Sequence, residues 1–452
     1  MNQTDNKITL SFVGDLLCPK EFIESAYLPE TNCYDFSPSL VKIKKYFSKS
    51  DYVIGNLETP LAGRDMQYAG SPGPYSYGFN APESYLQALI DAGIDLFTTA
   101  NNHCLDRGEL GLLKTLETLD KYGADHVGTY ASEYEQNTIF IKNIKGAKIA
   151  FLNYTFGINF NVHSRMLSPD KFYLVNLLSR PELQKYEDYW NVFPSLLSLK
   201  LPLSIGNKLL KTCDRYDYAS IADKVLQDIQ SAKSAGADLV VVLPHMGVEF
   251  TTTPLKFSQS LVDKFFAAGA DIIIGGHPHV LQPMEFRHIK NQDGTMRTGF
   301  VIYSLGNFLT ANIPYWPSDL CLKSIILNIH IRYDESTHNA TFDSVSYVPT
   351  VIQTRNKHNK HEMELVSIAD LNLLSTSEKE HSEMIKLNQQ IQSILGIQKT
   401  DDIISETYLF KSENSVKKRS FNQHIGIRNI FHKLPMRVLN AGYKFFISLR
   451  KR

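Results

Sequence analysis

Three histidines follow apolar runs that are typical of buried strands. In that position their side chains could bind a metal ion. His277 and His279 lie in the segment GGHPH directly after DIII, and His245 follows LVVVLP. A His-x-His pair at a strand end places two imidazoles toward nearby points, and imidazole is the commonest metal-binding side chain. The ordinary alternatives are hydrogen-bonded loop histidines for the pair and a structural or exposed side chain for His245. Metal binding is favoured because the same pattern, an apolar run followed by histidine, occurs before His245 and again before His277.

Oxygen-bearing side chains follow other apolar runs in the same way. Asp15 comes after ITLSFVG, Glu58 comes after YVIGN, and Asn102 and His103 come after LFTTAN. Carboxylates in such loops can bridge metal ions, and adjacent Asn and His residues suit oxygen ligation beside a proton donor. The alternative is helix capping, by Asn102 or Asp106 for the helix that follows.

These side chains form a ligand set of nitrogen and oxygen atoms without thiolates. The five cysteines are scattered and form no CxxC pair, which argues against a disulfide framework or a zinc knuckle. The set suits one or two divalent ions of manganese, iron or zinc. Its members are Asp15, Asn56, Glu58, Asn102, His103, His245, His277 and His279. We also expect substrate contacts from Asn56, Asn101, Glu249, Glu285 and Asn307. The alternative is a solvated loop carboxylate for Glu249 and Glu285, and a turn residue for Asn307.

Other catalytic motifs are missing from the sequence. It contains no GxxxxGK[ST], no GxGxxG and no GxSxG segment. These absences give no support to a P-loop, a dinucleotide site or a serine hydrolase.

The elements that must position these residues alternate between strands and helices. Apolar runs are expected as strands at residues 8–15, 52–58, 96–103, 239–247, 271–279 and 300–308. Helical patterns lie between them, at residues 83–92, 108–122, 221–235 and 257–268. Continuous apolar strands alternating with helices predict an α/β fold, whose sites form outside the carboxyl ends of the strands.

The 452-residue chain is long enough for additions to one enlarged domain. We predict a main domain over residues 1–353, with an insertion of about residues 159–215 over the site. Residues 354–410 are expected as a polar extension with a helix at residues 378–394. Residues 411–452 form a basic amphipathic tail, with eleven Lys and Arg residues and one acid.

The overall charge is balanced, with 47 basic and 47 acidic residues, so the basic tail leaves the remaining body acidic. A basic amphipathic stretch can bind anionic lipid, and a helix packed on the body is the alternative. No recognition motif accompanies the charge, so nucleic-acid binding is not expected. No signal peptide or transmembrane run is visible, which predicts a cytoplasmic protein or a peripheral one at the inner membrane face.

Six ordered motifs resemble the CapA family of poly-gamma-glutamate capsule-synthesis proteins. They are GDLL, GNLETPL, TANNHCLDRGELGLLKTLETLDKYG, LPHMGVE, GADIIIGGHPHVLQPME and IYSLGNF, and they cover residues 8–310 apart from the insertion. That family belongs to the metallo-dependent phosphatase-like superfamily. The resemblance implies a four-layer αββα sandwich of the metallophosphatase type, with metal ions at the strand ends. It also implies a capsule-synthesis complex as a partner of the basic tail.

The resemblance also implies a role for each ligand candidate. Asp15 fits the first aspartate, Glu58 stands at the metal-bridging position, and His103 fits the proton donor. The remaining metal ligands by similarity are Asn102, His245, His277 and His279. The sequence departs from the calcineurin-like pattern because Leu16 and Leu17 follow Asp15, so the first-block histidine is missing, and because Glu58 replaces an aspartate.

Two functions are therefore expected. The first is a metal-dependent hydrolase of phosphoester or capsule-type polymer bonds, acting on an anionic polymer or a phosphoester. The second is a non-catalytic polymer-binding assembly or export factor that keeps the metallophosphatase fold. The missing histidine favours the second function, whereas Asn102, His103 and the His-x-His pair favour the first.

Overall fold

The structure is a computed structural model, and it describes most of the chain. The described residues are 5–71, 78–159, 167–178, 223–291, 294–313, 316–337, 339–357, 360–397 and 403–410. The predicted tail at 411–452 lies outside them, as does the predicted insertion apart from residues 159 and 167–178.

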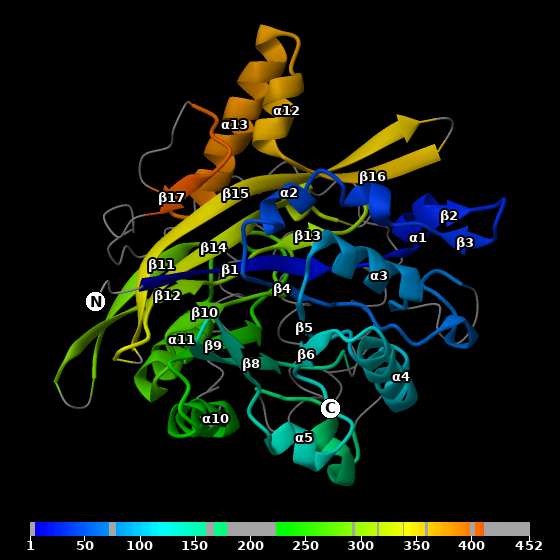
Figure 1. The fold of residues 1–452 in the computed structure, drawn as a ribbon. Helices are drawn as coiled ribbons and strands as arrows, with labels where there is room; N and C mark the ends of the chain where they lie inside the picture. The colour runs from blue at the N-terminus through cyan, green and yellow to red at the C-terminus, as the bar shows by residue number, and fades with distance from the viewer. Residues whose placement is uncertain are drawn as a thin grey trace, which may run out of the picture.

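The first sheet has nine strands and carries the N-terminal strand near its middle (Figure 1). Its main path runs β16 (Lys360–Ser367), β15 (Asn339–Lys357), β14 (Lys323–Asp334), β1 (Asp5–Leu16), β4 (Tyr52–Asn56), β5 (Leu96–Thr98) and β6 (Asp125–Val127). Two short strands join it, β13 (Asn307–Leu309) beside β1 and β17 (Tyr408–Phe410) beside β15. The strands β1, β4, β5 and β6 are parallel, so their carboxyl ends share one edge.

The second sheet has six strands and a similar parallel centre. Its order is β11 (Met284–Lys290), β12 (Met296–Ile302), β10 (Ile272–Ile274), β9 (Leu239–His245), β8 (Ala147–Thr155) and β7 (Ile141–Ile144). The strands β8, β9, β10 and β12 run parallel, whereas β7 and β11 are antiparallel edge strands. The four central strands therefore also end together.

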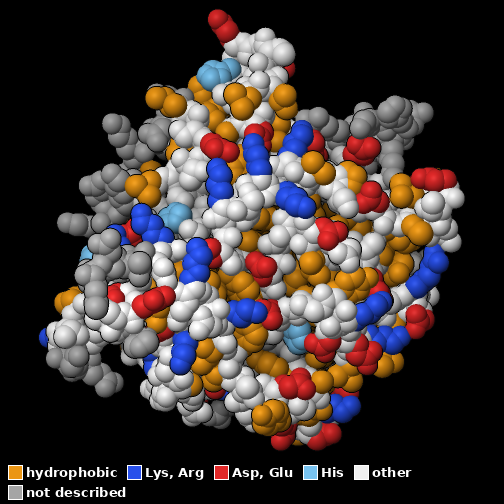
Figure 2. Space-filling model, viewed as in Figure 1, with side chains coloured by type: hydrophobic (Ala, Val, Ile, Leu, Met, Phe, Trp, Pro, Cys, Tyr) orange, Lys and Arg blue, Asp and Glu red, His pale blue; other side chains and the backbone are white. Residues whose placement is uncertain are grey.

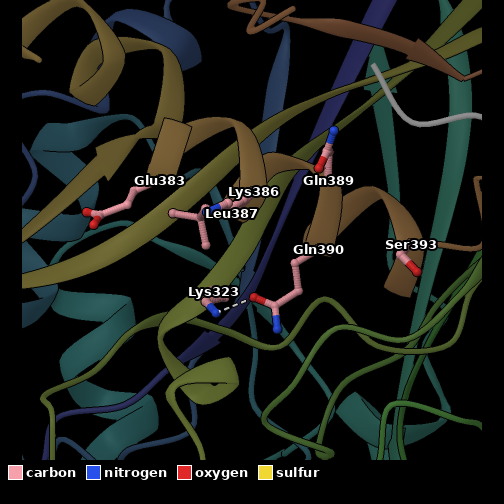
Figure 3. A pocket seen from close by; sticks show the side chains of 7 residues that line it. All are labelled: Lys323, Glu383, Lys386, Leu387, Gln389, Gln390 and Ser393. Atoms are coloured by element: carbon pink, nitrogen blue, oxygen red, sulfur yellow. Dashed lines mark hydrogen bonds between the residues drawn. The ribbon is translucent and has the colours of Figure 1, made fainter. Parts of the chain in front are cut away.

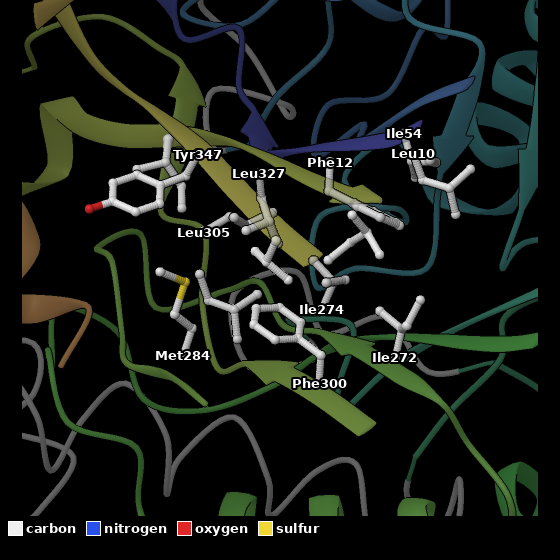
Figure 4. Packing of buried hydrophobic residues seen from close by; sticks show 14 of the residues in the cluster. Leu10, Phe12, Ile54, Ile272, Ile274, Met284, Phe300, Leu305, Leu327 and Tyr347 are labelled. Carbon is white, nitrogen blue, oxygen red and sulfur yellow. The ribbon is translucent and has the colours of Figure 1, made fainter. Parts of the chain in front are cut away.

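The two sheets pack face to face through one apolar core (Figure 4). Phe12 and Ile54 from the first sheet share this core with Phe151, Ile274 and Phe300 from the second. All five side chains are at least 95% buried. Apolar burial on this scale is the main favourable term in folding, and here it fixes the position of one sheet against the other.

Helices cover the outer face of each sheet. The helices α1 (Lys20–Ala26) and α3 (Glu83–Ala92) pack on the first sheet. The helices α10 (Asp223–Ser234) and α11 (Lys256–Ala268) pack on the second. The helix α4 (Gly108–Lys121) continues the outer layer near β6. The predicted four-layer αββα arrangement is confirmed, and the four helices expected from the sequence form within two residues of their predicted ends.

Glycine ends two of these helices for a physical reason. Gly93 follows α3 with φ 113°, and Gly269 follows α11 with φ 118°. A side chain is strained in this left-handed region, so glycine is the usual residue just past a helix end. Each glycine turns the chain directly into the next buried strand, β5 or β10.

The C-terminal described segment adds to the first sheet. The helices α12 (Ile368–Leu374) and α13 (Glu378–Ile394) stand beyond the sheet edge in Figure 1. Ser377 and Glu380 form a capping box that begins α13 where the sequence predicts a helix. Residues 354–410 also supply β16 and β17, and the predicted boundary at residue 353 falls within β15.

The face seen in Figure 2 carries Lys and Arg side chains interspersed with Asp and Glu. None of the helices in the described ranges is both long and apolar enough to cross a lipid bilayer.

Candidate metal centre

The carboxyl ends of both sheets meet at one point, and most of the predicted ligands lie there. Asp15 lies at the end of β1, Asn56 ends β4, and His245 ends β9. Gly276, which follows β10, lies close to the first sheet, since a Cβ there would lie 3.0 Å from Asp15 Oδ1. This close approach requires the smallest residue, and it brings the loop that carries His277 against the first sheet.

Two groups of side chains in the described part of the chain could each hold a metal ion. The first is Glu58, His277 and His279, and the second is Asp15, Glu58 and His245. Within each group, one ligand atom from each residue lies within 4.8 Å of the others. Glu58 Oε1 lies 3.3 Å from His245 Nε2 and 3.9 Å from His279 Nε2, so it stands between the groups.

The hydrogen bonding of these groups fits a cation. His277 is fully buried, and neither of its ring nitrogens has a hydrogen-bond partner. Both carboxylate oxygens of Glu58 and Oδ2 of Asp15 are buried without hydrogen bonds as well. Leaving a buried polar group unsatisfied costs roughly 1–3 kcal/mol, more when it is charged. Divalent ions would satisfy the carboxylate oxygens and one ring nitrogen of His277, so the residues present fit such ions.

Burial and the neighbouring charges shift the pKa values of these residues in both directions. Burial, then the charge of Asp15, raises the pKa of Glu58 well above its usual value. Burial lowers the pKa of His245 to about 3 and the pKa of His277 well below its usual range. Burial opposes ionisation of Asp15 and His279 too, but their close contact, 3.3 Å from Asp15 Oδ2 to His279 Nδ1, and their mutual attraction lower the pKa of Asp15 and raise that of His279. The imidazoles of His245 and His277, whose lowered pKa values keep them neutral, are ready to bind a cation.

Three asparagines that follow or end strands of the first sheet surround the candidate ligands Asp15 and His245. Asn102 Oδ1 lies 2.8 Å from His245 Nε2, so it faces the second ligand group. Asn56 donates to Asp15 Oδ1 at 2.8 Å, and its amide nitrogen lies 3.2 Å from His245 Nδ1. Asn101 donates to Asn56 Oδ1 at 3.3 Å and to the backbone carbonyl of Leu57 at 2.9 Å. Asn56 therefore orients Asp15, Asn101 orients Asn56, and the Asn102 oxygen faces the His245 nitrogen.

His103 lies at the edge of this cluster and is paired with a buried carboxylate. Its Nδ1 is 2.8 Å from Asp106 Oδ2, and its side chain is 17% exposed. Asp106 also accepts a hydrogen bond from the backbone N–H of Phe79, whose ring lies 4.5 Å from the His103 ring. The helix α4 has Arg107 at its N-cap with no side-chain cap, so the alternative of helix capping by Asn102 or Asp106 does not hold.

Three of the predicted substrate residues, Asn307, Glu249 and Glu285, differ in how they lie relative to the ligand groups. Asn307 Oδ1 lies 2.9 Å from His279 Nδ1, so it orients that ligand. Glu249 is half-buried close to the cluster, where burial raises its pKa while the charges of His279 and His103 oppose that rise. Glu285 lies on β11 and binds Arg287 and Tyr303 at 3.0 Å each. None of the contacts described for Glu285 reaches the ligand groups.

Sequence reasoning missed several residues at this site. Asp106 carried the signal of a carboxylate three residues after His103, but we considered it only as a cap. The Asn159 amide nitrogen lies 3.4 Å from His103 Nδ1, and the Asn159 side-chain oxygen accepts a hydrogen bond from Asn102 at 3.2 Å. The ring of Trp316 lies 5.2 Å from the ring of His279. No sequence pattern singles out Asn159 or Trp316, because only the fold brings them here.

A hollow lies away from the metal centre, along α13 at the start of β14 (Figure 3). Its volume is about 700 Å³, and its lining includes Lys323, Glu383 and Gln390. The ammonium of Lys323 binds Gln390 at 2.6 Å and Asp319 at 2.9 Å, so its charge is already compensated. The lining contains none of the predicted site residues, and the chemistry is expected at the strand ends instead.

Comparison with known proteins identifies relatives over the same part of the chain. The family described as "Bacterial capsule synthesis protein PGA_cap" matches residues 9–312. The capsule biosynthesis protein CapA of Bacillus anthracis is 26% identical over 311 residues, which are 68% of this chain and 61% of the relative. The PGA biosynthesis protein CapA of Bacillus subtilis (strain 168) is 26% identical over 308 residues, 68% of this chain and 64% of that protein. The alignments thus span about three fifths of the relatives' own length.

Solved structures give more distant matches. A novel phosphatase from Mycoplasma pneumoniae matches with a TM-score of 0.39 and 15% identity, covering 77% of this chain and 95% of that one. The calcineurin-like phosphoesterase YfkN from Bacillus subtilis has a TM-score of 0.39 and 13% identity, covering 86% and 98%.

Proposed function

Because this chain belongs to the bacterial capsule synthesis family PGA_cap, we propose that it acts in capsule or exopolymer biosynthesis as a metal-dependent hydrolase. The bond that it cleaves is a phosphoester or a bond of the polymer itself. One observation carries the proposal: Glu58 is buried, both of its oxygens lack hydrogen bonds, and it is shared by two potential ligand groups. A carboxylate in that position is suited to bridging two cations.

The residues that would hold the metal are Asp15, Glu58, Asn102, His245, His277 and His279. Nitrogen and oxygen ligands without thiolate suit manganese, iron or zinc. When bound, such ions polarise a phosphoryl or carbonyl oxygen and lower the pKa of bound water. Bound ions would also provide partners for buried polar atoms of these residues. Metal binding and folding would therefore support each other.

His103 is the residue placed to deliver a proton to the leaving group. Its Nδ1 faces Asp106, and this pairing fixes the ring with its Nδ1–H on the carboxylate. Nε2 is then the atom that can carry a transferable proton. Asp106 is fully buried and holds the tautomer without itself contacting the metal groups in the described contacts, so we assign it as a positioning residue.

The direct test combines elemental analysis with turnover of bis(p-nitrophenyl) phosphate. We expect one to two equivalents of metal in the parent and at most one in the His277→Ala/His279→Ala variant. The His103→Ala variant should keep its metal but lose turnover by about 10²–10⁴, the usual contribution of a general acid. The exposed His288 on β11 provides a matched control, since His288→Ala should change neither quantity. A metal-free parent after reconstitution would overturn the proposal.

A non-catalytic role in polymer binding is the second candidate. Leu17 is fully buried at the place where the calcineurin-like pattern has a histidine, so one ligand of that pattern is lost. Capsule production in cells distinguishes the two roles. A scaffold keeps its cellular role in the His103→Ala variant, whereas a hydrolase loses it.

The basic tail supports a membrane-surface role as a separate proposal. Residues 411–452 carry a net charge of +10, and each cation near anionic lipid adds about 1 kcal/mol to binding. Deleting residues 411–452 should abolish binding to vesicles of anionic lipid in a sedimentation assay. Unchanged sedimentation would rule out the membrane role.

A further inference from the structure

The side-chain amide of Asn102 has two polar ends, and each end faces a different partner. Its Oδ1 lies 2.8 Å from Nε2 of His245, a member of the second ligand group. Its amide nitrogen donates a hydrogen bond to Asn159 Oδ1 at 3.2 Å. Both asparagines are buried. Because only the oxygen of a side-chain amide binds a cation, the orientation of this group decides whether Asn102 can be a ligand.

The backbone that leads into Asn102 is held by the second sheet. Asn153 on β8 is fully buried, and its Oδ1 accepts a hydrogen bond from the N–H of Ala100 at 2.7 Å. Its amide nitrogen donates to the carbonyl of Leu243 on β9 at 2.8 Å. One side chain thereby joins the loop before Asn102 to the strand that ends at His245. These bonds fix the backbone, but they leave the Asn102 amide two orientations of nearly the same shape.

Asn159 is the residue that distinguishes these two orientations. In the observed orientation its oxygen accepts a hydrogen bond from the Asn102 amide nitrogen. If Asn102 alone turned over, two acceptor oxygens would face each other and the hydrogen bond would be lost in a buried place. The Asn159 amide nitrogen also lies 3.4 Å from His103 Nδ1, so Asn159 contacts both a candidate ligand and the proton donor.

The segment that carries Asn159 is tied to the histidine ligands. The N–H of Phe156 donates to the carbonyl of His245 at 3.1 Å, and the Phe156 ring lies 4.5 Å from the ring of His277. Asn159 has φ 53°, in the left-handed region that asparagine tolerates better than most residues. That conformation is one reason for an asparagine here, and the hydrogen bond to Asn102 is a second, independent reason.

We propose that Asn159 is a positioning residue of the metal centre, which holds the Asn102 oxygen toward the cation. The inference rests on the proposed function, because it concerns a ligand of that same centre. It requires that Asn159 acts on metal affinity through Asn102.

The test removes the side chain of Asn159 without straining its backbone. Glycine adopts a φ of 53° freely, so Asn159→Gly deletes the amide alone. Mn²⁺ and Zn²⁺ are titrated separately into the metal-free full-length chain in a calorimeter. We expect Asn159→Gly to bind metal about 10- to 100-fold more weakly than the parent, the usual effect of losing a residue that orients a ligand. Unchanged affinity would overturn the proposal and leave the left-handed backbone as the reason for this asparagine.

Asn32→Gly is the matched control. Asn32 has the same φ of 53° and is exposed in the turn between β2 (Tyr27–Leu28) and β3 (Cys33–Tyr34). This variant should bind metal as tightly as the parent, and thermal melting checks that both glycine variants fold. Equally weakened binding in the two variants would indicate a general effect of glycine and contradict a specific role of Asn159.

A conservative variant covers the case in which Asn159→Gly does not fold. Asn159→Asp keeps an acceptor oxygen for the Asn102 amide nitrogen, and its negative charge also attracts the cation. We expect it to bind metal at least as tightly as the parent. A folded Asn159→Asp variant whose affinity is about 10-fold or more below that of the parent would overturn the proposal.

A double-mutant cycle tests whether the effect passes through Asn102. Asn102→Ala removes the ligand oxygen, so adding Asn159→Gly should then weaken metal binding by no more than about twofold. The same further loss as in the parent background would show that Asn159 acts by another route, which contradicts the proposal.

The same titrations separate failure of this inference from failure of the proposed function. A parent chain that binds neither Mn²⁺ nor Zn²⁺ removes the metal centre, and the role of Asn159 is removed with it. A parent that binds metal no more tightly than Asn159→Gly keeps the metal centre and removes the positioning role alone.

Discussion

The two sheets supply chemically different side chains to the same point. The first sheet contributes oxygen atoms, through Asp15, Glu58 and Asn102. The second contributes imidazoles, through His245, His277 and His279. Each potential ligand group includes residues from both sheets. The centre is therefore a property of the contact between the sheets, and neither sheet holds a complete group.

The difference extends to how each set of ligands is held. The oxygen ligands lie in a network of asparagine amides, with Asn56 bound to Asp15 and Asn101 bound to Asn56. Two of the histidines, His277 and His279, are constrained by their backbone, since they have positive φ values, 96° and 56°. A side-chain network can adjust to a lost ion, whereas a strained backbone is fixed by its surroundings. We expect the histidine loop to be the rigid half of the centre.

The sharpest test of this comparison is the shared carboxylate. Glu58→Gln should remove metal from both groups, so the metal content falls to near zero. His277→Ala should affect one group only and leave up to one equivalent when the parent holds two. Elemental analysis after reconstitution with manganese or zinc measures both. Equal metal loss in the two variants would show that Glu58 is not shared.

The packing between the sheets should matter to the metal as well as to stability. Phe151→Ala empties a fully buried position in the core between the sheets and should cost about 3–5 kcal/mol. Phe265→Ala on α11 is the control, because it removes an equally buried ring from the outer layer. Urea unfolding should show similar losses, while calorimetry should show weaker metal binding for Phe151→Ala alone. Equal metal affinities would mean that sheet packing does not set the centre.

Asp106 tests whether the oxygen side also positions the proton donor. Asp106→Asn keeps the shape but removes the charge beside His103, and we expect turnover to fall by about 10- to 100-fold. Metal content should be unchanged, and the alkaline limb of the pH–rate profile, where a general acid loses its proton, should move. A uniform loss of activity with an unmoved profile would point to a purely structural role.

The smallest expected effect concerns pH and the metal-free protein. Because the pKa of Glu58 is raised in the folded chain, the folded state keeps a proton that the unfolded state loses above its ordinary pKa of 4.5. The contribution of Glu58 to stability therefore falls as pH rises above that value. In EDTA, Glu58→Gln should be more stable than the parent at pH 7, and this advantage should vanish at pH 4. Urea midpoints at the two pH values measure it, and a pH-independent difference would contradict it.

Much of this architecture could be predicted from local sequence. The runs before Asp15, His245 and His277 are continuous and rich in β-branched residues, which is the pattern of strands buried on both faces. The helix at residues 378–394 begins where Ser377 and Glu380 predict a capping box. These signals lie within a few residues of one another, so no knowledge of the fold is needed to read them.

Predictions that depended on distant contacts were less complete. Glu285 follows a promising motif, yet β11 pairs with β12 and turns it toward Arg287 and Tyr303. Asp106 was expected at most to cap a helix, but the bend of the chain brings it against His103 and Phe79. Both outcomes depend on which segments lie across from these residues, and a local pattern carries no such information.

The sequence by itself determined which side chains are available at the strand ends: carboxylates and amides after three strands, imidazoles after two others. The tertiary structure decided that these ends meet, that Glu58 stands between both groups, and that Trp316 comes to rest beside His279. The physical reason is that strand formation follows from local apolar patterns, whereas the position of one sheet on another follows from burying a core shared by residues hundreds of positions apart.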